Sequence, residues 1–115
     1  MTIKRIGVGP RMSQAVIHGD RVFLAGQVAE APTPDVTEQT RQILATIDSL
    51  LAEAGTDKTK LLTANIWLAD IADFAAMNAA WDKWVSPGNT PARATVESKL
   101  AGPEYRVEIQ VTAAI

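Results

Sequence analysis

Cysteine is absent from the 115-residue sequence, and histidine occurs only once. Disulfide bonds, thiolate catalysis and cysteine metal sites are therefore excluded. A zinc site made of several histidines cannot form within one chain, and a Ser-His-Asp triad would have to use His18. Because His18 lies in an Ile-His-Gly-Asp stretch typical of a turn, we interpret it as a turn residue.

Long apolar runs and basic runs are missing as well. No apolar run approaches the roughly 20 residues of a membrane-spanning helix, and Met1–Ile6 lacks the apolar core of a signal peptide. We therefore expect a cytoplasmic protein with no membrane partner. The 11 lysines and arginines against 13 aspartates and glutamates give a formal net charge of −2. Since phosphate neutralisation dominates duplex binding, this balance disfavours nucleic acid as a principal partner.

The remaining composition is that of an ordinary globular protein, with 47% hydrophobic and 21% charged residues. A chain of this length suits a single domain, residues 1–115, and can bury a real core.

The hydrophobic pattern predicts the element order β-β-β-α-β-α-β-β. We expect strands at 3–6, 14–17 and 21–28, a helix from 35 to 54, a strand at 62–68, a helix at 71–85, and strands at 93–98 and 105–114. Asp35 and Glu38 form a capping-box-like pair at the start of the first helix, and Gly55 supplies its stop signal. Asp70 is the expected cap of the second helix. Gly26, inside the third strand, suggests a bulge or a close approach by another backbone.

Both predicted helices are amphipathic, so we expect them side by side on one face of a single mixed sheet, an α+β fold. The expected apolar stripe of the second helix is Phe74, Asn78, Trp81 and Val85. In the last strand, the residues expected to face the helices are Tyr105, Val107, Ile109 and Val111. The residues expected on the uncovered face are Ala25, Gln27, Asn65, Trp67, Thr95, Gln110 and Thr112. A mixed face of small and amide side chains fits a semi-polar protein interface, which predicts an oligomer.

Two charged residues on the last two strands are the candidates for chemistry. Arg93 follows Pro91, which restricts the backbone just before the strand, and an arginine held there can grip a carboxylate with its planar fork. Glu108 lies mid-strand on the mixed face, where it can orient a water or meet a basic partner group. The structural alternatives are a surface arginine paired with Glu97 or Glu104, and a solvated strand glutamate. The two strands are consecutive in sequence, which can place Arg93 and Glu108 near one site.

Other polar and aromatic residues have simpler explanations. Asn78 lies on an apolar stripe, where an unsatisfied amide costs about 1–3 kcal/mol, and capping a neighbouring loop is favoured over contact with a ligand. Trp81 and Trp84 are interpreted as core and packing residues, because base stacking would need a basic groove. Gly7 and Gly9 form G-x-G without the strand and helix of a phosphate loop.

Seven segments run along nearly the whole chain in a specific order. They are Ser13-Gln14-Ala15-Val16, Val22-Phe23-Leu24-Ala25-Gly26-Gln27, Glu38-Gln39-Thr40, Leu50-Leu51-Ala52-Glu53-Ala54-Gly55, Asp73-Phe74-Ala75-Ala76-Met77-Asn78, Pro91-Ala92-Arg93 and Val107-Glu108-Ile109. Each is weak alone, but their order and spacing together resemble the RidA/YjgF family, also known as the L-PSP endoribonucleases. The resemblance implies a chorismate-mutase-like fold, assembled as a homotrimer with a small-molecule cleft between each pair of neighbouring subunits.

The resemblance also implies an activity, the hydrolysis of reactive 2-enamine or 2-imine acids to 2-keto acids and ammonia. Arg93 matches the family arginine that holds the substrate carboxylate, and Glu108 matches the glutamate that positions the hydrolytic water. The reaction needs neither metal nor cofactor, since water attacks a carbon that is already electrophilic. The residues expected to bind substrate are Arg93, Met12, Ala25, Gly26, Thr95 and Asn78.

Three positions depart from the family pattern. Met12 stands where a tyrosine is usual, Ala25 where a serine is usual, and Thr95 where a cysteine is often found. The stretch Trp81-Asp82-Lys83-Trp84 resembles the YoaB-like branch. The resemblance therefore carries over to carboxylate binding at Arg93 more directly than to activity on 2-aminoacrylate.

Two other functions stay open. The clefts can sense a keto acid or an amino acid without turning it over. The ribonuclease or translation-inhibitor activity attached to some family members is disfavoured by the acidic balance.

Overall fold

The computed structural model describes all 115 residues, and it contains the predicted sequence of six strands and two α-helices. The strands are β1 (Ile3–Ile6), β2 (Ala15–His18), β3 (Arg21–Leu24), β4 (Leu61–Leu68), β5 (Ala92–Glu97) and β6 (Val107–Ala114). The helices are α1 (Val36–Glu53) and α2 (Phe74–Trp84), with short 3₁₀ helices η1 (Lys58–Lys60) and η2 (Ile71–Asp73).

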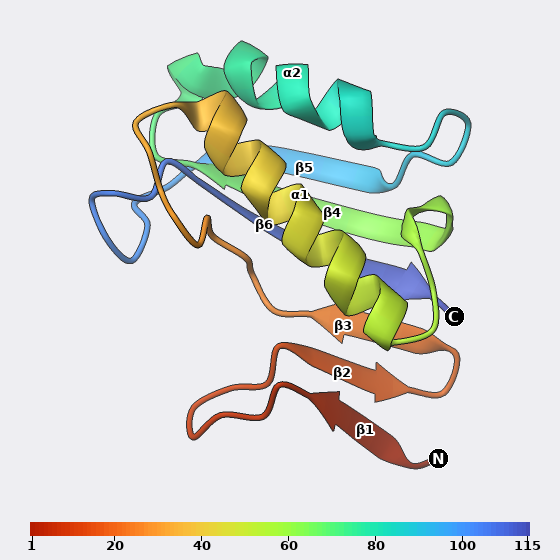
Figure 1. Ribbon diagram of the computed structural model, residues 1–115. Helices are drawn as coiled ribbons and strands as arrows, with labels where there is room; N and C mark the ends of the chain where they lie inside the picture. The colour runs from red at the N-terminus through yellow and green to blue at the C-terminus, as the bar shows by residue number, and fades with distance from the viewer.

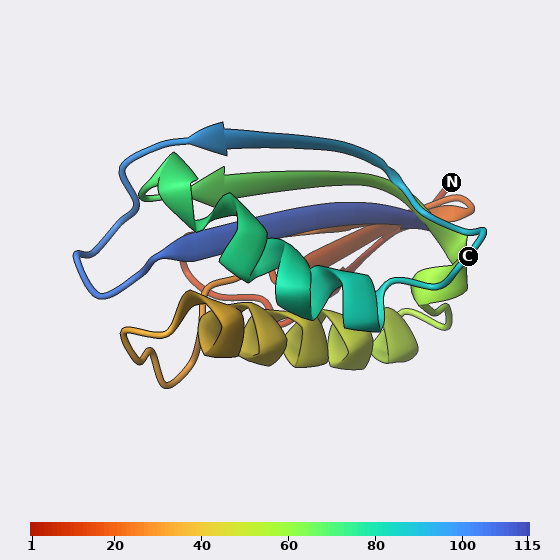
Figure 2. The same ribbon diagram turned by 90° about the horizontal axis from the view of Figure 1, so that it is seen from above.

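One sheet contains all six strands in the order β1-β2-β3-β6-β4-β5. Only β4 and β5 pair in parallel, and the other neighbours are antiparallel, which confirms the predicted mixed sheet. Both helices lie on the same face of this sheet, side by side, as Figures 1 and 2 show. The α+β class expected from the pattern is therefore confirmed.

The core lies between the helices and the sheet. Its fully buried members alternate along β6 as Val107, Ile109, Val111 and Ala113, and recur along α1 at helical spacing. None of the helices combines the length and the apolar composition that crossing a bilayer requires.

Helix α1 begins and ends where the sequence predicts. The Asp35 carboxylate accepts hydrogen bonds from the backbone N–H groups of Thr37 and Glu38, and Gly55 adopts a φ of +85° just after the helix. The reciprocal bond of a capping box is not made, because the Glu38 carboxylate binds Arg41 instead.

Several predicted boundaries are wrong. Strand β3 ends at Leu24, and Gln27 makes only an isolated bridge to Ile109. In β4 a register shift exposes Leu62 while Leu61 is buried, so Leu62 does not share the face of the core residues. Tyr105 lies outside β6, just after a turn that its N–H closes with the carbonyl of Gly102.

The second predicted helix is divided into two parts. Asp70 caps the 3₁₀ helix η2, and α2 starts only at Phe74. Met77 is fully buried, whereas Phe74 is 41% exposed, so the expected stripe does not simply face the core.

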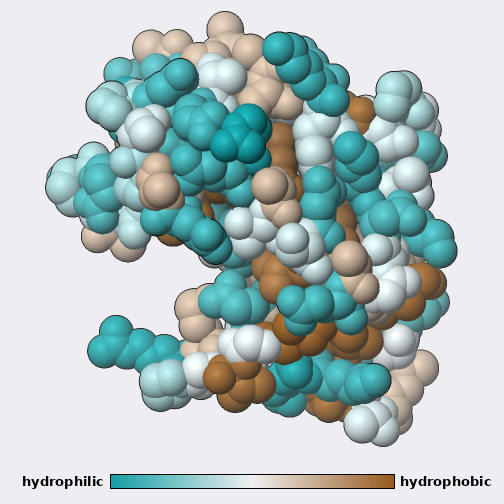
Figure 3. Space-filling model, viewed as in Figure 1, coloured by the Kyte–Doolittle hydropathy of each residue, from teal (hydrophilic) through white to brown (hydrophobic).

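No helix covers the opposite face of the sheet. It carries Asn65, Trp67, Gln110 and Thr112, as predicted from alternation. Thr95 and Gln27 were wrongly expected there, because they pair with Ile66 and Ile109, whose side chains face the core. Figure 3 views the face that the helices cover. There, hydrophilic side chains gather over the helices and hydrophobic ones show mainly over β2 and β3.

Candidate active site

Arg93 lies on the helix side of the edge strand β5. Its register partner in β4 is Ala64, a core residue, so the arginine side chain is directed toward α2. The guanidinium carbon lies 5.7 Å from the ring centre of Phe74 and 5.2 Å from that of Trp81. Nη1 donates a hydrogen bond of 2.8 Å to Oδ1 of Asn78. We call these four residues the arginine cluster.

The contacts of Arg93 decide between the sequence interpretations. Arg93 forms no ion pair, so the surface pairing with Glu97 or Glu104 is wrong. Glu97 instead accepts a hydrogen bond from the backbone N–H of Ile71. The partner of Asn78 is Arg93 and not a loop, which corrects the favoured capping role. The cluster thus holds a partly buried cation that has one hydrogen bond and no counter-charge.

Thr95 lies two residues beyond Arg93 on the same face of β5. Its hydroxyl is buried and has no hydrogen-bond partner. Buried hydroxyls normally have a hydrogen-bond partner. A ligand bound beside Thr95 and Arg93 could supply both the partner that this hydroxyl lacks and the negative charge that the guanidinium lacks.

Glu108 lies on the opposite face of the sheet. Its register partner is Trp67, and its neighbours Val107 and Ile109 point into the core. The carboxylate packs against Gly26 so closely that a Cβ there would stand 2.1 Å from Oε2. The close approach inferred from Gly26 therefore exists, but a side chain makes it and not a backbone. Partial burial raises the pKa of the Glu108 carboxyl above its ordinary value of 4.5.

The backbone around Gly26 is held by glutamine side chains. Gln27 donates from Nε2 to Oε1 of Gln14 at 3.0 Å and to the carbonyl of Ala25 at 3.0 Å. Gln110 donates from Nε2 to the carbonyl of Leu24 at 3.3 Å. Gly26 lies against Glu108 and Ala25 precedes it in the chain, and we call these three residues the glutamate cluster.

Met12 lies in the loop that joins β1 to β2. Its carbonyl closes a turn with the N–H of Gly9 at 2.8 Å, and its side chain is 49% exposed. No hydrogen bond ties Met12 to either cluster.

A single subunit does not bring Arg93 and Glu108 together. They lie on consecutive strands in sequence, but β4 separates β5 from β6 in the sheet. Their register partners Ala64 and Trp67 are three residues apart on β4, so the two side chains point to opposite faces. The expectation that consecutive strands place them near one site is wrong for one chain, because strand order is not sequence order.

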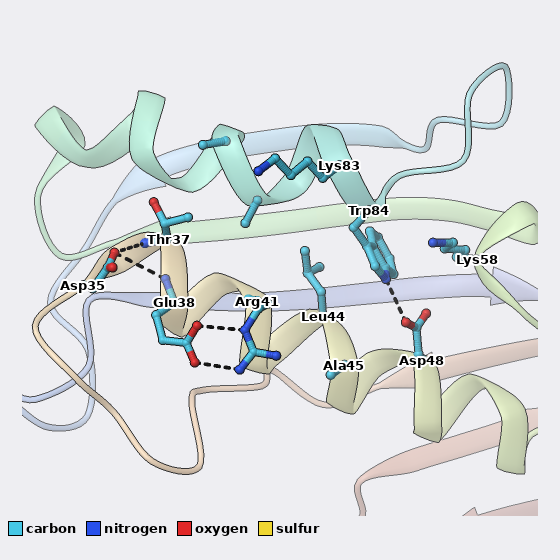
Figure 4. Close-up of a pocket in the computed structure, with 12 residues that line it drawn as sticks. Asp35, Thr37, Glu38, Arg41, Leu44, Ala45, Asp48, Lys58, Lys83 and Trp84 are labelled. Carbon is cyan, nitrogen blue, oxygen red and sulfur yellow. Dashed lines mark hydrogen bonds and ion pairs between the residues drawn. The ribbon is translucent and has the colours of Figure 1, made fainter.

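A groove of about 410 Å³ between α1 and α2 lies outside both clusters (Figure 4). Glu38 and Arg41, both on α1, form an ion pair along one wall, and the Trp84 indole N–H of α2 donates to Asp48 of α1 at 3.0 Å. Hydrogen bonds from Arg41 and Gln42 hold the pKa of the Glu38 carboxyl well below its usual range. Because these polar groups already satisfy one another, we assign the groove no ligand.

The two aromatic contacts of Arg93 were missed as functional residues. Trp81 was interpreted as core, and Phe74 only as part of an apolar stripe. The spacing shows that Phe74, Asn78 and Trp81 share one face of a helix, but it does not show that Arg93 lies against that face.

Comparison with known proteins agrees with this architecture. The Endoribonuclease L-PSP family model matches residues 2–115. The RutC family protein YoaB of Escherichia coli is 47% identical over 115 residues, and the alignment covers 100% of both chains. The chain belongs to the RidA/YjgF family, in its YoaB-like branch.

Other RidA/YjgF members support the same assignment. A RutC family protein of Haemophilus ducreyi is 46% identical over 113 residues, covering 98% of this chain and 97% of the relative. The crystal structure of NMB1025, a YjgF family member from Neisseria meningitidis, superposes with a TM-score of 0.97 at 50% identity. That superposition covers 99% of this chain and 95% of the other. The predicted RidA/YjgF membership is confirmed.

Proposed function

We propose that the chain assembles as a homotrimer whose inter-subunit clefts hydrolyse small 2-enamine or 2-imine acids to 2-keto acids and ammonia. The observation that carries this proposal is the arginine cluster. Its guanidinium is partly buried, makes a single hydrogen bond and has no carboxylate partner. A cation in that state favours a counter-charge, and a ligand carboxylate fits the planar guanidinium fork through two parallel hydrogen bonds.

The separation of the two clusters supports an oligomer, and the family resemblance implies that it is a trimer. Since Arg93 and Glu108 point to opposite faces of one sheet, they can act on one substrate only when they come from two subunits. The open face carries amide side chains together with partly exposed Trp67 and 50% exposed Val96. Such a mixed, uncovered face is typical of a subunit interface.

The proposed reaction requires one protein base and the correct orientation of substrate and water. An enamine first takes a proton from solvent at C3 and becomes the iminium ion. Water then adds to C2 and forms a C–O bond while the C=N π pair moves to nitrogen, and the Glu108 carboxylate accepts a proton from that water. Proton transfer to nitrogen makes it the leaving group, and the C–N bond breaks with its electron pair on nitrogen. Ammonia departs, and loss of the hydroxyl proton gives the 2-keto acid.

Each residue has a defined part in this scheme. Arg93 holds the substrate carboxylate, and Glu108 of the partner subunit orients the water. Thr95 offers its unpaired hydroxyl beside Arg93. Met12, Ala25 and Gly26 shape the far wall of the cleft. Holding the substrate and the water in the orientation for attack is sufficient for rate acceleration, because the substrate carbon is already electrophilic.

A second function, carboxylate sensing without turnover, is favoured by one observation. Met12 and Ala25 bring no hydroxyl to the positions where the resemblance implies a tyrosine and a serine. This function uses the same Arg93 anchor and requires no action of Glu108. Calorimetric binding of 2-ketobutyrate by a protein that releases no ammonia from an imine would favour it.

The test of the deaminase is Arg93→Ala with freshly generated 2-iminopropionate as substrate. Loss of two charge-assisted hydrogen bonds should lower kcat/KM for ammonia release by about 100-fold or more. Arg41→Ala is the matched control, because Arg41 pairs with Glu38 on α1, away from both clusters. Ammonia release that is unchanged in Arg93→Ala, with the control also unchanged, would refute the assignment.

A further inference from the structure

We infer that Phe74 and Trp81 are positioning residues, whose rings fix the Arg93 guanidinium so that its free edge receives a carboxylate. The inference rests on the proposed function, since it concerns the anchor of that same site. It assigns to two aromatic residues a role in ligand affinity that core packing does not supply.

The guanidinium lies within cation–π distance of both rings. Phe74 and Trp81 are seven residues apart on α2, which corresponds to about 10.5 Å along the helix axis. The guanidinium carbon of Arg93 lies 5.7 Å from one ring centre and 5.2 Å from the other, about half that length in each case. Asn78 lies between them in sequence and on the same helix face, and it binds Nη1 at 2.8 Å.

These contacts restrict the orientation of the guanidinium and determine which of its N–H donors remain free. A cation within about 6 Å of a ring centre is attracted by the ring's negative face, and a guanidinium also stacks on aromatic rings. Of its five N–H donors, one is taken by Asn78. The remaining donors lie in the guanidinium plane, where a carboxylate forms two parallel bonds. The rings therefore remove much of the orientational freedom that ligand binding would otherwise have to remove.

Core packing does not explain Phe74. Trp81 is 5% exposed and belongs to the hydrophobic core, so its position has a structural cause. Phe74 is 41% exposed and lies outside that core, yet its ring lies beside Arg93. An aromatic ring kept half in solvent next to a cation with no counter-charge is better explained by the cation than by burial.

The test uses Phe74, because changing the buried Trp81 can also unfold the protein. Phe74→Leu removes the ring and keeps an apolar side chain, whereas Phe74→Tyr keeps the ring. Ile71→Ala is the control for loss of an exposed apolar group nearby, since Ile71 is 47% exposed. The readouts are the ¹⁵N relaxation of the Arg93 Nε–H group, the Kd of 2-ketobutyrate by calorimetry, and KM and kcat for imine hydrolysis.

We expect Phe74→Leu to raise Kd and KM about 3–10-fold while kcat changes less than about twofold. Without the ring, the ligand would have to order the Arg93 side chain when it binds, and that cost in free energy weakens binding. The order parameter of the Arg93 Nε–H group should fall from about 0.8 to below about 0.6. Phe74→Tyr and Ile71→Ala should behave like the wild-type protein. Unchanged Kd and unchanged order in Phe74→Leu would overturn the inference.

Parallel measurements on Arg93→Ala separate this inference from the proposed function. If Arg93→Ala loses 2-ketobutyrate binding and Phe74→Leu keeps it, only the role of the rings is overturned. If Arg93→Ala binds as tightly as the wild type, both the anchor and its positioning are overturned. If the wild type binds 2-ketobutyrate without hydrolysing the imine, the deaminase is overturned, and a raised Kd in Phe74→Leu still supports the inference.

Discussion

The position of the Glu108 carboxylate depends on a residue that has no side chain. Gly26 leaves the space into which Oε2 packs, and a Cβ at that position would come within 2.1 Å of this oxygen. The packing also removes water from the carboxyl group, which raises its pKa above 4.5 because burial disfavours the charged form. Gly26 therefore leaves the space that the proposed base occupies, and in that place partial burial raises its pKa.

The raised pKa of Glu108 determines how kcat/KM should change with pH. The base must be ionised to accept a proton from water, so kcat/KM should fall as pH decreases through a pKa above 4.5. Gly26→Ala should push the carboxyl group into water, return its pKa toward 4.5 and move the acidic limb to lower pH. Misplacement of the base should also lower kcat at neutral pH about 10–100-fold. The pH profile of imine hydrolysis measures both effects.

Gly102→Ala is the matched control for Gly26→Ala. A Cβ at Gly102 would come within 2.6 Å of the Glu104 carboxylate oxygens, so it displaces a glutamate in the same way, outside both clusters. Its pH profile should match that of the wild type. An acidic limb that stays in place in Gly26→Ala would show that Glu108 is not the titrating base.

At the scale of elements, helix α1 holds two loops in place through one buried amide. The Gln39 side chain is fully buried, and its Nε2 donates to the carbonyls of Thr33 at 2.6 Å and Glu104 at 2.9 Å. Its Oε1 accepts from the backbone N–H of Arg106 at 2.9 Å. Arg106 in turn pairs with Asp73, just before α2, at 2.7 Å. The loop before α1 and the turn before β6 are therefore joined at one point.

Gln39→Leu should lower the free energy of unfolding by about 2–5 kcal/mol, because it leaves three backbone groups without their partner. Denaturant unfolding followed by circular dichroism measures this loss. Gln42→Leu makes the same change on the same helix, where the amide binds the exposed Ala31 backbone, and should cost about 1 kcal/mol or less. Equal losses in the two variants would contradict the role given to Gln39.

Local signals predicted the elements, and long-range packing limited their accuracy. The start of α1 follows from Asp35 and its end from Gly55, which are signals within a few residues. Just after β3, Gly26 makes room for Glu108, a residue far away in sequence. A sequence pattern cannot show that contact before the strand order is known.

The candidate site was predictable in its residues and not in their arrangement. The proline before Arg93 and the alternation around Glu108 selected both residues. Their separation within the sheet follows from the insertion of β4 between β5 and β6, and their opposite faces follow from the register of each strand with β4. The contact of Arg93 with Phe74 and Trp81 likewise depends on where α2 crosses the edge of the sheet, which the spacing along the helix does not give.

In the assembled protein, the proposed activity requires a site divided between subunits. One sheet separates Arg93 from Glu108, and only the face that carries Arg93 is covered by helices. A closed ring of three copies repeats one interface three times. Each interface would then join Arg93 of one subunit to Glu108 of the partner subunit.

Subunit mixing tests this division most directly. Arg93→Ala and Glu108→Gln should each be inactive on 2-iminopropionate while remaining trimeric, with a mass three times 12.3 kDa by light scattering. After the two are mixed in equal amounts, unfolded and refolded together, three quarters of random trimers contain both kinds of subunit. Each mixed ring has one intact interface of three, so about one quarter of wild-type activity should return. Refolding that yields mixed trimers but no ammonia release would contradict a site shared between subunits.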